Sequence, residues 1–240
     1  MIDVLHPVIV EAGLTEREEK LLLRYAELIQ EENKKYNLTA IVDDEGIAEK
    51  HFRDSLSALA LIPDGCSLVD LGSGAGLPSV PIAIARPGVE VTAVESVGKK
   101  CNFLSLVSRE LGLGNLKVEY TRIEDLARTD RREGYDVVIA RAVAPLNTLL
   151  EYAAPLIKVG GSALLFKGKN YAEELSNAEG VAEVLGLKQK EIIVYDLKND
   201  EKRAIIVYKK ISKTDKKFPR GGNKPRINPV AGGKNGKKVR

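Results

Sequence analysis

Three glycines at alternate positions follow an apolar run in the stretch LVDLGSGAGLPSVP, residues 68–81. The run ends in Asp70, and the glycines are Gly72, Gly74 and Gly76. A glycine-rich turn after a strand lets the backbone approach a ligand closely, because glycine adopts positive φ freely. A dinucleotide-binding GxGxxG motif would need glycine where Leu77 stands, and a P-loop would need a Gly-Lys-Ser/Thr that is missing. The stretch predicts a ligand-binding turn of another kind, with a tight turn that binds nothing as the alternative.

Two prolines follow the glycines, at Pro78 and Pro81. A helix that begins near Pro78 tolerates both, because the first amides of a helix have no intrahelical partner. The same amides form the phosphate site at a helix N-terminus, and proline has no amide hydrogen to donate. The loop therefore favours a ligand that carries no phosphate at this point.

Glu95 ends the next apolar run, VEVTAVES. A carboxylate at the end of the second strand of such a fold accepts hydrogen bonds from ribose hydroxyls. A ribose without a nearby phosphate indicates S-adenosylmethionine. Ile123 and Glu124 would flank its adenine, although Glu124 could equally be an acidic residue that stabilises a helix N-terminus.

The elements that position these residues alternate between short apolar runs and helical stretches. We predict strands near 66–71, 89–95, 116–121, 135–141, 161–167, 190–196 and 203–210, and helices near 79–86, 98–112, 145–157 and 171–186. This alternation predicts an α/β fold with right-handed crossovers. The sheet is expected to be seven-stranded and mostly parallel, with the last strand antiparallel because only a short connection precedes it.

Helices are also predicted upstream, in an N-terminal extension over residues 1–64. Thr15 begins a run to about Tyr36, with Glu18 completing a capping box, and Asn37 is a candidate C-cap. Asp44 can cap a second run, through Leu61. The Rossmann-like domain then covers residues 65–211.

The charge is distributed unevenly along the 240 residues. Residues 209–240 hold 12 Lys or Arg and one acid, a charge of +11, whereas residues 1–208 hold 25 basic and 33 acidic residues, a charge of −8. Residues 212–240 are predicted to form a basic, flexible tail. Such a tail is either solvated or bound to nucleic-acid phosphates.

Composition limits the remaining function classes. A content of 44% hydrophobic and 30% charged residues is typical of a globular protein. No apolar stretch reaches the ~18 residues that span a bilayer, and we see no signal peptide. Cys66 and Cys101 are isolated in the sequence, so we expect no zinc site or other metal and a reducing, cytoplasmic location.

Several motifs together resemble one family. These are DLGSGAGLPSVPIAI, KKCNFL, YDVVIARAVAPL, LLFKGK, YNLTAI and HFRDSL, between residues 36 and 169, with a weaker echo in FPRGGNKP. They look like the RsmG (GidB) family, whose members are class I, S-adenosylmethionine-dependent methyltransferases of guanine N7 in small-subunit ribosomal RNA. The resemblance implies cofactor contacts at Gly72, Leu77, Glu95, Ser96, Val97, Ile123, Glu124 and Arg141, to which the glycine-loop pattern adds Asp70, Gly74 and Gly76. Leu77 stands where the family usually has Phe, and Ile123 where it often has Ala.

The sequence fits this chemistry. Guanine N7 has a lone pair and no proton, so it needs no general base, and proximity and in-line alignment can carry the reaction. Arg141 can orient the guanine or the cofactor, unless it forms a structural ion pair. Candidate contacts to ribosomal RNA or its particle are Asn37, His51, Asp54, Lys99, Lys100, Arg122, Lys167 and Arg220. His51 and Asp54 could instead form a structural patch. We expect a monomer; the alternatives are a methyltransferase for another RNA or a small molecule, or a noncatalytic RNA-binding module.

Overall fold

The computed structural model describes residues 1–231, and the chain forms two compact units within it. The first contains residues 1–122 and 196–201, and the second contains residues 123–195 and, of the described residues, 202–231. The strands form one sheet in the order β3-β2-β1-β4-β5-β7-β6. The predicted seven-stranded, mostly parallel α/β sheet is confirmed.

The first unit contains three parallel strands, β1 (Ser67–Leu71), β2 (Glu90–Glu95) and β3 (Leu116–Tyr120). Their apolar side chains are buried because helices cover them, and α5 (Ser79–Ala85) and α6 (Gly98–Glu110) form the crossovers. Each of these five elements lies within a few residues of its predicted range.

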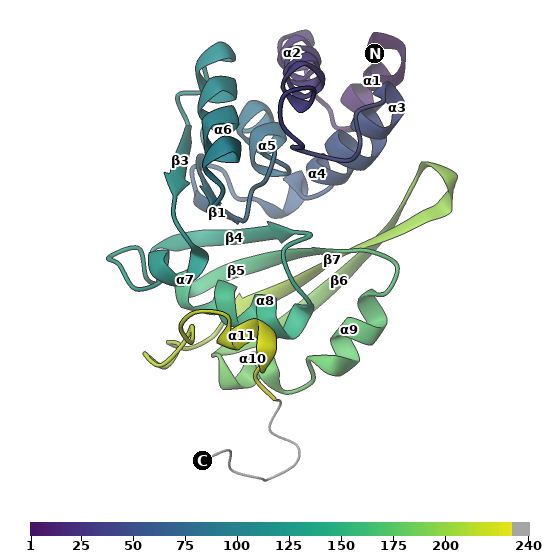
Figure 1. The fold of residues 1–240 in the computed structure, drawn as a ribbon. Coiled ribbons are helices and arrows are strands. Elements are labelled where there is room, and N and C mark those ends of the chain that lie inside the picture. The colour runs from purple at the N-terminus through teal and green to yellow at the C-terminus, as the bar shows by residue number, and fades with distance from the viewer. Residues whose placement is uncertain (232–240) are drawn as a thin grey trace. The chain divides into compact units, whose positions relative to one another are not determined.

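The N-terminal extension begins with a helix that the sequence pattern did not predict, α1 (Ile2–Glu11). It contains Pro7 and has no side-chain cap, so the usual start and stop signals are missing. The next helix, α2 (Glu16–Asn33), has the predicted capping box of Thr15 and Glu18. It packs against α5 and α6 (Figure 1).

The second predicted helix, from Asp44 to Leu61, is not continuous. It divides into α3 (Asp44–Gly46), the π-helix η1 (Ile47–Arg53), α4 (Asp54–Leu56) and the 3₁₀ turn η2 (Leu59–Leu61). A π-helix widens the hydrogen-bond spacing and shifts the side chains around the axis, which a period of 3.6 residues does not anticipate.

The second unit contains β4 (Tyr135–Arg141), β5 (Ile157–Lys167), β6 (Leu187–Leu197) and β7 (Glu201–Lys210), although residues 196–201, with the turn η4 (Lys198–Asp200), belong to the first. β4 and β5 are parallel, whereas β5 and β7 are antiparallel. The helical elements are α7 (Ile123–Leu126), α8 (Leu146–Ala153), η3 (Ala154–Leu156), α9 (Tyr171–Asn177), α10 (Val181–Val184) and α11 (Lys224–Ile227). The predicted helix 171–186 is interrupted before Gly180, which has φ +75°.

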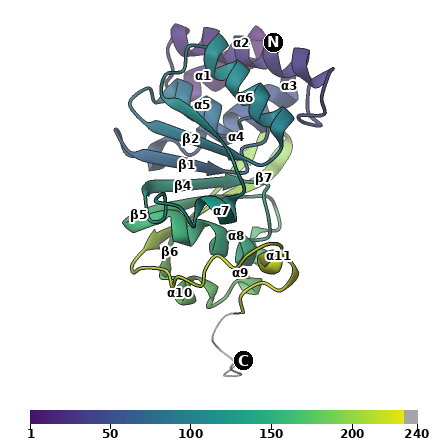
Figure 2. The same cartoon turned by 60° about the vertical axis from the view of Figure 1, so that its left-hand side comes forward.

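The segment after β7 differs from the expected flexible tail. Residues 212–231 have a defined course in the second unit, and α11 lies beside α8 in both views (Figures 1 and 2). Composition misses this because the segment is held by hydrogen bonds from distant side chains to its own carbonyls. Residues 232–240, the rest of the predicted tail, lie outside the described residues.

Candidate functional site

The glycine loop connects β1 to α5, and its conformation requires glycine. Gly72, Gly74 and Gly76 have φ of +67°, +60° and +94°. A Cβ on Gly76 would come within 2.5 Å of Val80 Cγ2, whereas the nearest atom to a Cβ on Gly74 would be the Gly72 carbonyl oxygen, 3.9 Å away. The loop is therefore packed tightly against the interior at Gly76 and is open at Gly74, where a ligand can approach.

Glu95 joins the glycine loop to the turn that follows β2. Its carboxylate accepts hydrogen bonds from the backbone N–H groups of Gly74 (2.9 Å), Ser96 (2.7 Å) and Val97 (2.9 Å). The side chain is buried, and Ser96 and Val97 are exposed beside it. A carboxylate has about four acceptor positions, so Oε2, which accepts only the Gly74 amide among these three bonds, has one left for a hydroxyl. The arrangement fits a ribose-bearing cofactor at the carboxyl ends of β1 and β2.

Tyr25 contacts the same loop, and no sequence pattern predicted this role. Its side chain is fully buried in α2, stacks on Phe52 with ring centroids 5.5 Å apart, and donates a hydrogen bond to the Ala75 carbonyl at 2.6 Å. Its hydroxyl oxygen would lie 3.0 Å from a Cβ on Gly76. No local motif identifies such a residue, because its partner lies 50 positions away along the chain.

The prolines lie as predicted, at the start of α5. Pro78 is the residue before the helix, Pro81 lies in its first turn, and the Leu77–Pro78 bond is cis. The first-turn amide of Val80 donates to the Gly76 carbonyl at 2.7 Å. The turn therefore offers few free amides to an anion.

Three predicted cofactor residues belong to the second unit. Ile123 and Glu124 begin α7, and the Glu124 side chain is buried. Arg141 is the last residue of β4 and is half-buried, and Ala142 after it has φ +56°. Their predicted contacts to the cofactor remain predictions.

The RNA-contact candidates of the first unit fall into two groups. Asn37, Lys99 and Arg122 are exposed, and Lys100 is half-buried in the first turn of α6. By contrast, His51 and Asp54 are buried. His51 Nε2 lies 3.1 Å from Thr39 Oγ1 and 3.3 Å from the Ile41 carbonyl oxygen, so the imidazole holds the segment after α2 in place.

The predicted C-cap role of Asn37 is wrong. Helix α2 ends at Asn33, four residues earlier than Asn37. The Asn33 side chain accepts hydrogen bonds from the amides of Leu38 (2.8 Å) and Thr39 (3.0 Å) and thereby reverses the chain. Two asparagines so close together give the same sequence signal, and only their different hydrogen bonds distinguish them.

The two candidates of the second unit are both in ion pairs. Lys167 Nζ is buried and lies 2.6 Å from Glu174 Oε2 and 2.8 Å from the Ala144 carbonyl oxygen. Arg220 forms a bidentate pair with Glu151, whose side chain is fully buried. Their charges therefore stabilise the unit itself.

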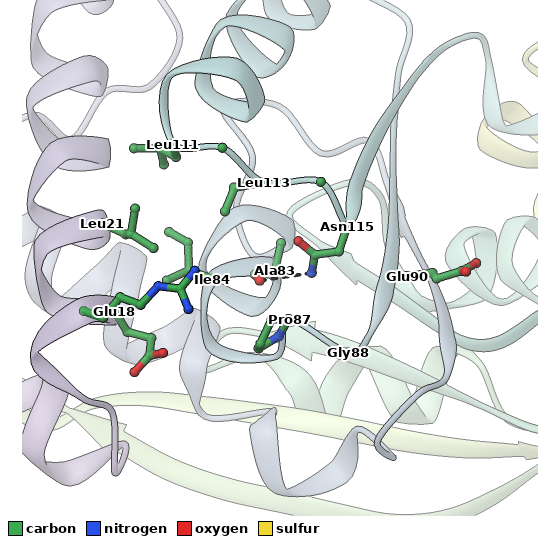
Figure 3. Close-up of a pocket in the computed structure, with 13 residues that line it drawn as sticks. Glu18, Leu21, Ala83, Ile84, Pro87, Gly88, Glu90, Leu111, Leu113 and Asn115 are labelled. Carbon is green, nitrogen blue, oxygen red and sulfur yellow. Dashed lines mark hydrogen bonds between the residues drawn. The ribbon is translucent and has the colours of Figure 1, made fainter.

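A pocket of about 530 Å³ opens elsewhere in the first unit (Figure 3). It is lined by Glu18 and Leu21 of α2 and by residues that precede β2 and β3, including Gly88 and Leu113. Asn115 in its wall donates to the carbonyls of Ala83, Arg86 and Val89 and is thereby committed to the fold. Because the pocket lies at the amino ends of the strands, it is not the cofactor site, which α/β folds place at the carboxyl ends.

Comparison with known proteins places this geometry in a family. Residues 18–206 match the family described as GidB, rRNA small subunit methyltransferase G. The chain belongs to this family. It is 42% identical over 226 residues to ribosomal RNA small subunit methyltransferase G of Carboxydothermus hydrogenoformans, covering 92% of this chain and 96% of that protein. It is 41% identical over 222 residues to the protein of the same name from Alkaliphilus oremlandii, covering 90% and 92%.

Solved structures agree on the fold. The crystal structure of M. jannaschii TYW2 in complex with AdoMet matches with a TM-score of 0.56 and 17% identity, covering 72% of this chain and 80% of that one. TrmN from Thermus thermophilus matches with a TM-score of 0.52 and 18% identity, covering 65% and 48%. The family and the class I fold confirm the prediction of S-adenosylmethionine as the cofactor of this methyltransferase.

The remaining chemical features concern only residues 1–231. In that range no helix is long and apolar enough to cross a membrane, and no cluster of three or more His, Cys, Asp or Glu could hold a metal ion. Both cysteines are buried, and neither forms a disulfide bond within these residues. Burial and the charge of Glu95 raise the pKa of the Cys101 thiol, so Cys101 behaves as an apolar residue behind the Glu95 turn.

Proposed function

We propose that this protein transfers the methyl group of S-adenosylmethionine to N7 of a guanine in 16S ribosomal RNA of the small subunit. The observation that carries the proposal is the match to relatives named ribosomal RNA small subunit methyltransferase G along nearly their whole length. The named substrate of those relatives supports the RNA class. The guanine and its N7 atom rest on the resemblance of the ARAVA and HFRDSL motifs.

The proposed cofactor site combines the glycine loop with Glu95. The remaining acceptor position of Glu95 would bind a ribose hydroxyl, and the exposed Ser96 and Val97 would contact the adenine. The open side of Gly74 would face the methionine end. Asp70 and Leu77 complete the proposed set within the first unit.

The proposed reaction needs no general base among the side chains. When bound, the cofactor supplies a methyl group on a positively charged sulfonium, which is activated for transfer. Guanine N7 would attack the methyl carbon with its own lone pair while the methyl–sulfur bond breaks and S-adenosylhomocysteine leaves, and the base would lose no proton. The protein would therefore mainly align the two reactants, which can lower a barrier by roughly 7–11 kcal/mol. The end of β4 and the turn after it read ARAVAPL and lack the Asp/Asn/Ser-Pro-Pro-aromatic motif common in amino-group methylation of adenine.

Arg141 is the proposed orienting residue, because its guanidinium can donate in a planar fork to base acceptors or a carboxylate. Replacing Arg141 with Ala should abolish methylation while the melting temperature stays close to that of the wild type. Normal turnover by the variant would exclude this role.

The decisive experiment incubates the purified protein and labelled S-adenosylmethionine with ribosomal RNA, and with small subunits, from a strain that lacks the protein. The methylated position is then mapped by cleavage at N7-methylguanine. Label on adenine or cytosine would contradict the N7 assignment, and efficient methylation of free nucleosides would favour a small-molecule substrate. Failure to bind S-adenosylmethionine would support a noncatalytic RNA-binding module. We expect a cytoplasmic monomer, which cell fractionation and size-exclusion chromatography test.

A further inference from the structure

The segment of residues 213–228, here named the C-terminal strap, is attached to the second unit mainly through its backbone. Arg132 donates to the carbonyls of Thr214 (2.9 Å), Asp215 (3.1 Å) and Phe218 (2.8 Å). Thr148 in α8 donates to the Pro225 carbonyl at 2.9 Å. Because these bonds use main-chain oxygens, they fix the course of the strap without using its side-chain charges.

The strap is also bonded to the two segments that carry the proposed site residues of this unit. Arg128 donates to the carbonyls of Glu124 (3.4 Å) and Pro219 (3.0 Å) and so joins α7 to the strap. Arg226 donates to the Val143 carbonyl at 3.3 Å, two residues after Arg141. The strap is therefore a neighbour of both α7 and the turn after β4.

The strap is strongly basic, with six basic residues and one acidic residue between positions 213 and 228. Arg220 is paired with Glu151, and Lys217 lies 3.2 Å from Asp215. The other four, Lys213, Lys216, Lys224 and Arg226, are exposed. Within residues 1–231 none of these four forms an ion pair, so their charge faces solvent.

We propose that the strap is an RNA-docking edge in which Lys216, Lys224 and Arg226 contact phosphates on either side of the methylated nucleotide. This inference rests on the proposed function, because it takes ribosomal RNA as the partner. Cations on a fixed backbone bind a polyanion at a smaller entropic cost than cations on a flexible tail. Arg220 is then an anchor of the strap and contacts no RNA.

The test uses Lys216→Ala/Lys224→Ala, since neither side chain has a partner within the described residues and folding should be unaffected. Binding to 16S ribosomal RNA is measured over a series of salt concentrations. Loss of two phosphate contacts should flatten the slope of log affinity against log salt by roughly 1.4 to 1.8 and weaken binding by about tenfold at moderate salt. Affinity for S-adenosylmethionine should not change.

The matched control is Lys188→Ala/Lys202→Ala, which removes two exposed charges from β6 and β7 of the same unit. It should keep the wild-type slope to within a few tenths. Equal slopes for the wild type and the strap variant, or equal losses in the strap variant and the control, would overturn the inference. If the wild type binds RNA through the strap but does not methylate it, the proposed function fails and the docking edge stands. If the wild type methylates RNA and the strap variant binds normally, only the docking edge fails.

Discussion

The glycine loop and the C-terminal strap both contain glycine and proline, yet the chain specifies their conformations in different ways. In the loop each of the three glycines has a positive φ, so the conformation follows from the residues at those positions. In the strap the conformation follows from Arg128, Arg132 and Glu151, whose hydrogen bonds to strap residues span 69 to 91 positions of the chain.

This difference shows which kinds of functional segment can be recognised from sequence. A loop whose backbone needs glycine carries its own signal. A segment held by donors from elsewhere looks disordered by composition, because low hydrophobicity and high charge are also the marks of disorder. Substitutions in the two regions should therefore have different effects, and the following experiments distinguish those effects.

The largest effect is expected from removing the anchor of the strap. Arg220→Ala leaves the fully buried Glu151 carboxylate without its cation, and breaking a buried pair in this way costs roughly 3–5 kcal/mol. We expect the lower end of that range, because Arg220 itself is partly exposed. Urea unfolding measures the loss, and limited proteolysis should cut the strap first.

The control for this variant is the double substitution Arg220→Ala/Glu151→Gln, which removes the orphaned charge as well. It should regain much of the lost stability. Equal stability of the single and double variants would show that the ion pair does not hold the strap.

The next effect concerns the loop. Gly76→Ala adds a Cβ that would lie 2.5 Å from Val80 Cγ2 and 2.9 Å from Leu104 Cδ2, at φ +94°. Backbone strain and overpacking together should cost about 2–3 kcal/mol, with loss of cofactor binding. Gly88→Ala is the control, because its φ is not positive and no atom lies within 4 Å of the added Cβ. If both variants bind S-adenosylmethionine equally, the tight packing at Gly76 does not shape the cofactor site.

Sequence reasoning succeeded where periodicity and local chemistry decide the structure. The seven strands, the glycine loop and the capping box at Thr15 follow from alternation, glycine spacing and a local side-chain pattern. The π-helix η1 was not predicted, because a π-helix has no sequence period of its own. The role of Tyr25 was not predicted either, because its hydroxyl donates to a carbonyl far along the chain. The course of the strap could not be predicted for the same reason, because the residues that hold it lie far along the chain.

The stability of the protein should depend on pH through Lys210, which lies where β7 meets the strap. Lys210, at the end of β7, is buried and donates to the Ala154 carbonyl and to Thr214 Oγ1. Burial lowers the pKa of Lys210 to about 8, with the charge of Glu133 opposing that shift and the charge of Arg132 adding to it.

The unfolded chain therefore binds more protons than the folded one between pH 8 and 10.5, the ordinary pKa of a lysine, and the free energy of unfolding contributed by Lys210 rises with pH in that window. We expect a gain on the order of 2 kcal/mol from pH 8 to pH 10. It is measured as the difference in urea stability between the wild type and Lys210→Met, which cannot titrate. A difference that stays constant with pH would mean that the buried amine keeps an ordinary pKa.

The smallest expected effect tests whether the loop, too, depends on a distant residue. Tyr25→Phe removes only the hydroxyl that donates to the Ala75 carbonyl at 2.6 Å and leaves the ring stacked on Phe52. Losing one buried hydrogen bond should cost about 1 kcal/mol of stability. If the bond also holds the loop in shape, the KM for S-adenosylmethionine should rise several-fold while the KM for ribosomal RNA stays constant.

The control is Tyr208→Phe, which removes the hydroxyl of a tyrosine buried in the second unit and should leave both KM values unchanged. A rise shared by both variants would reflect general destabilisation, whereas a rise in Tyr25→Phe alone would show that local glycine chemistry and one long-range donor together define the loop.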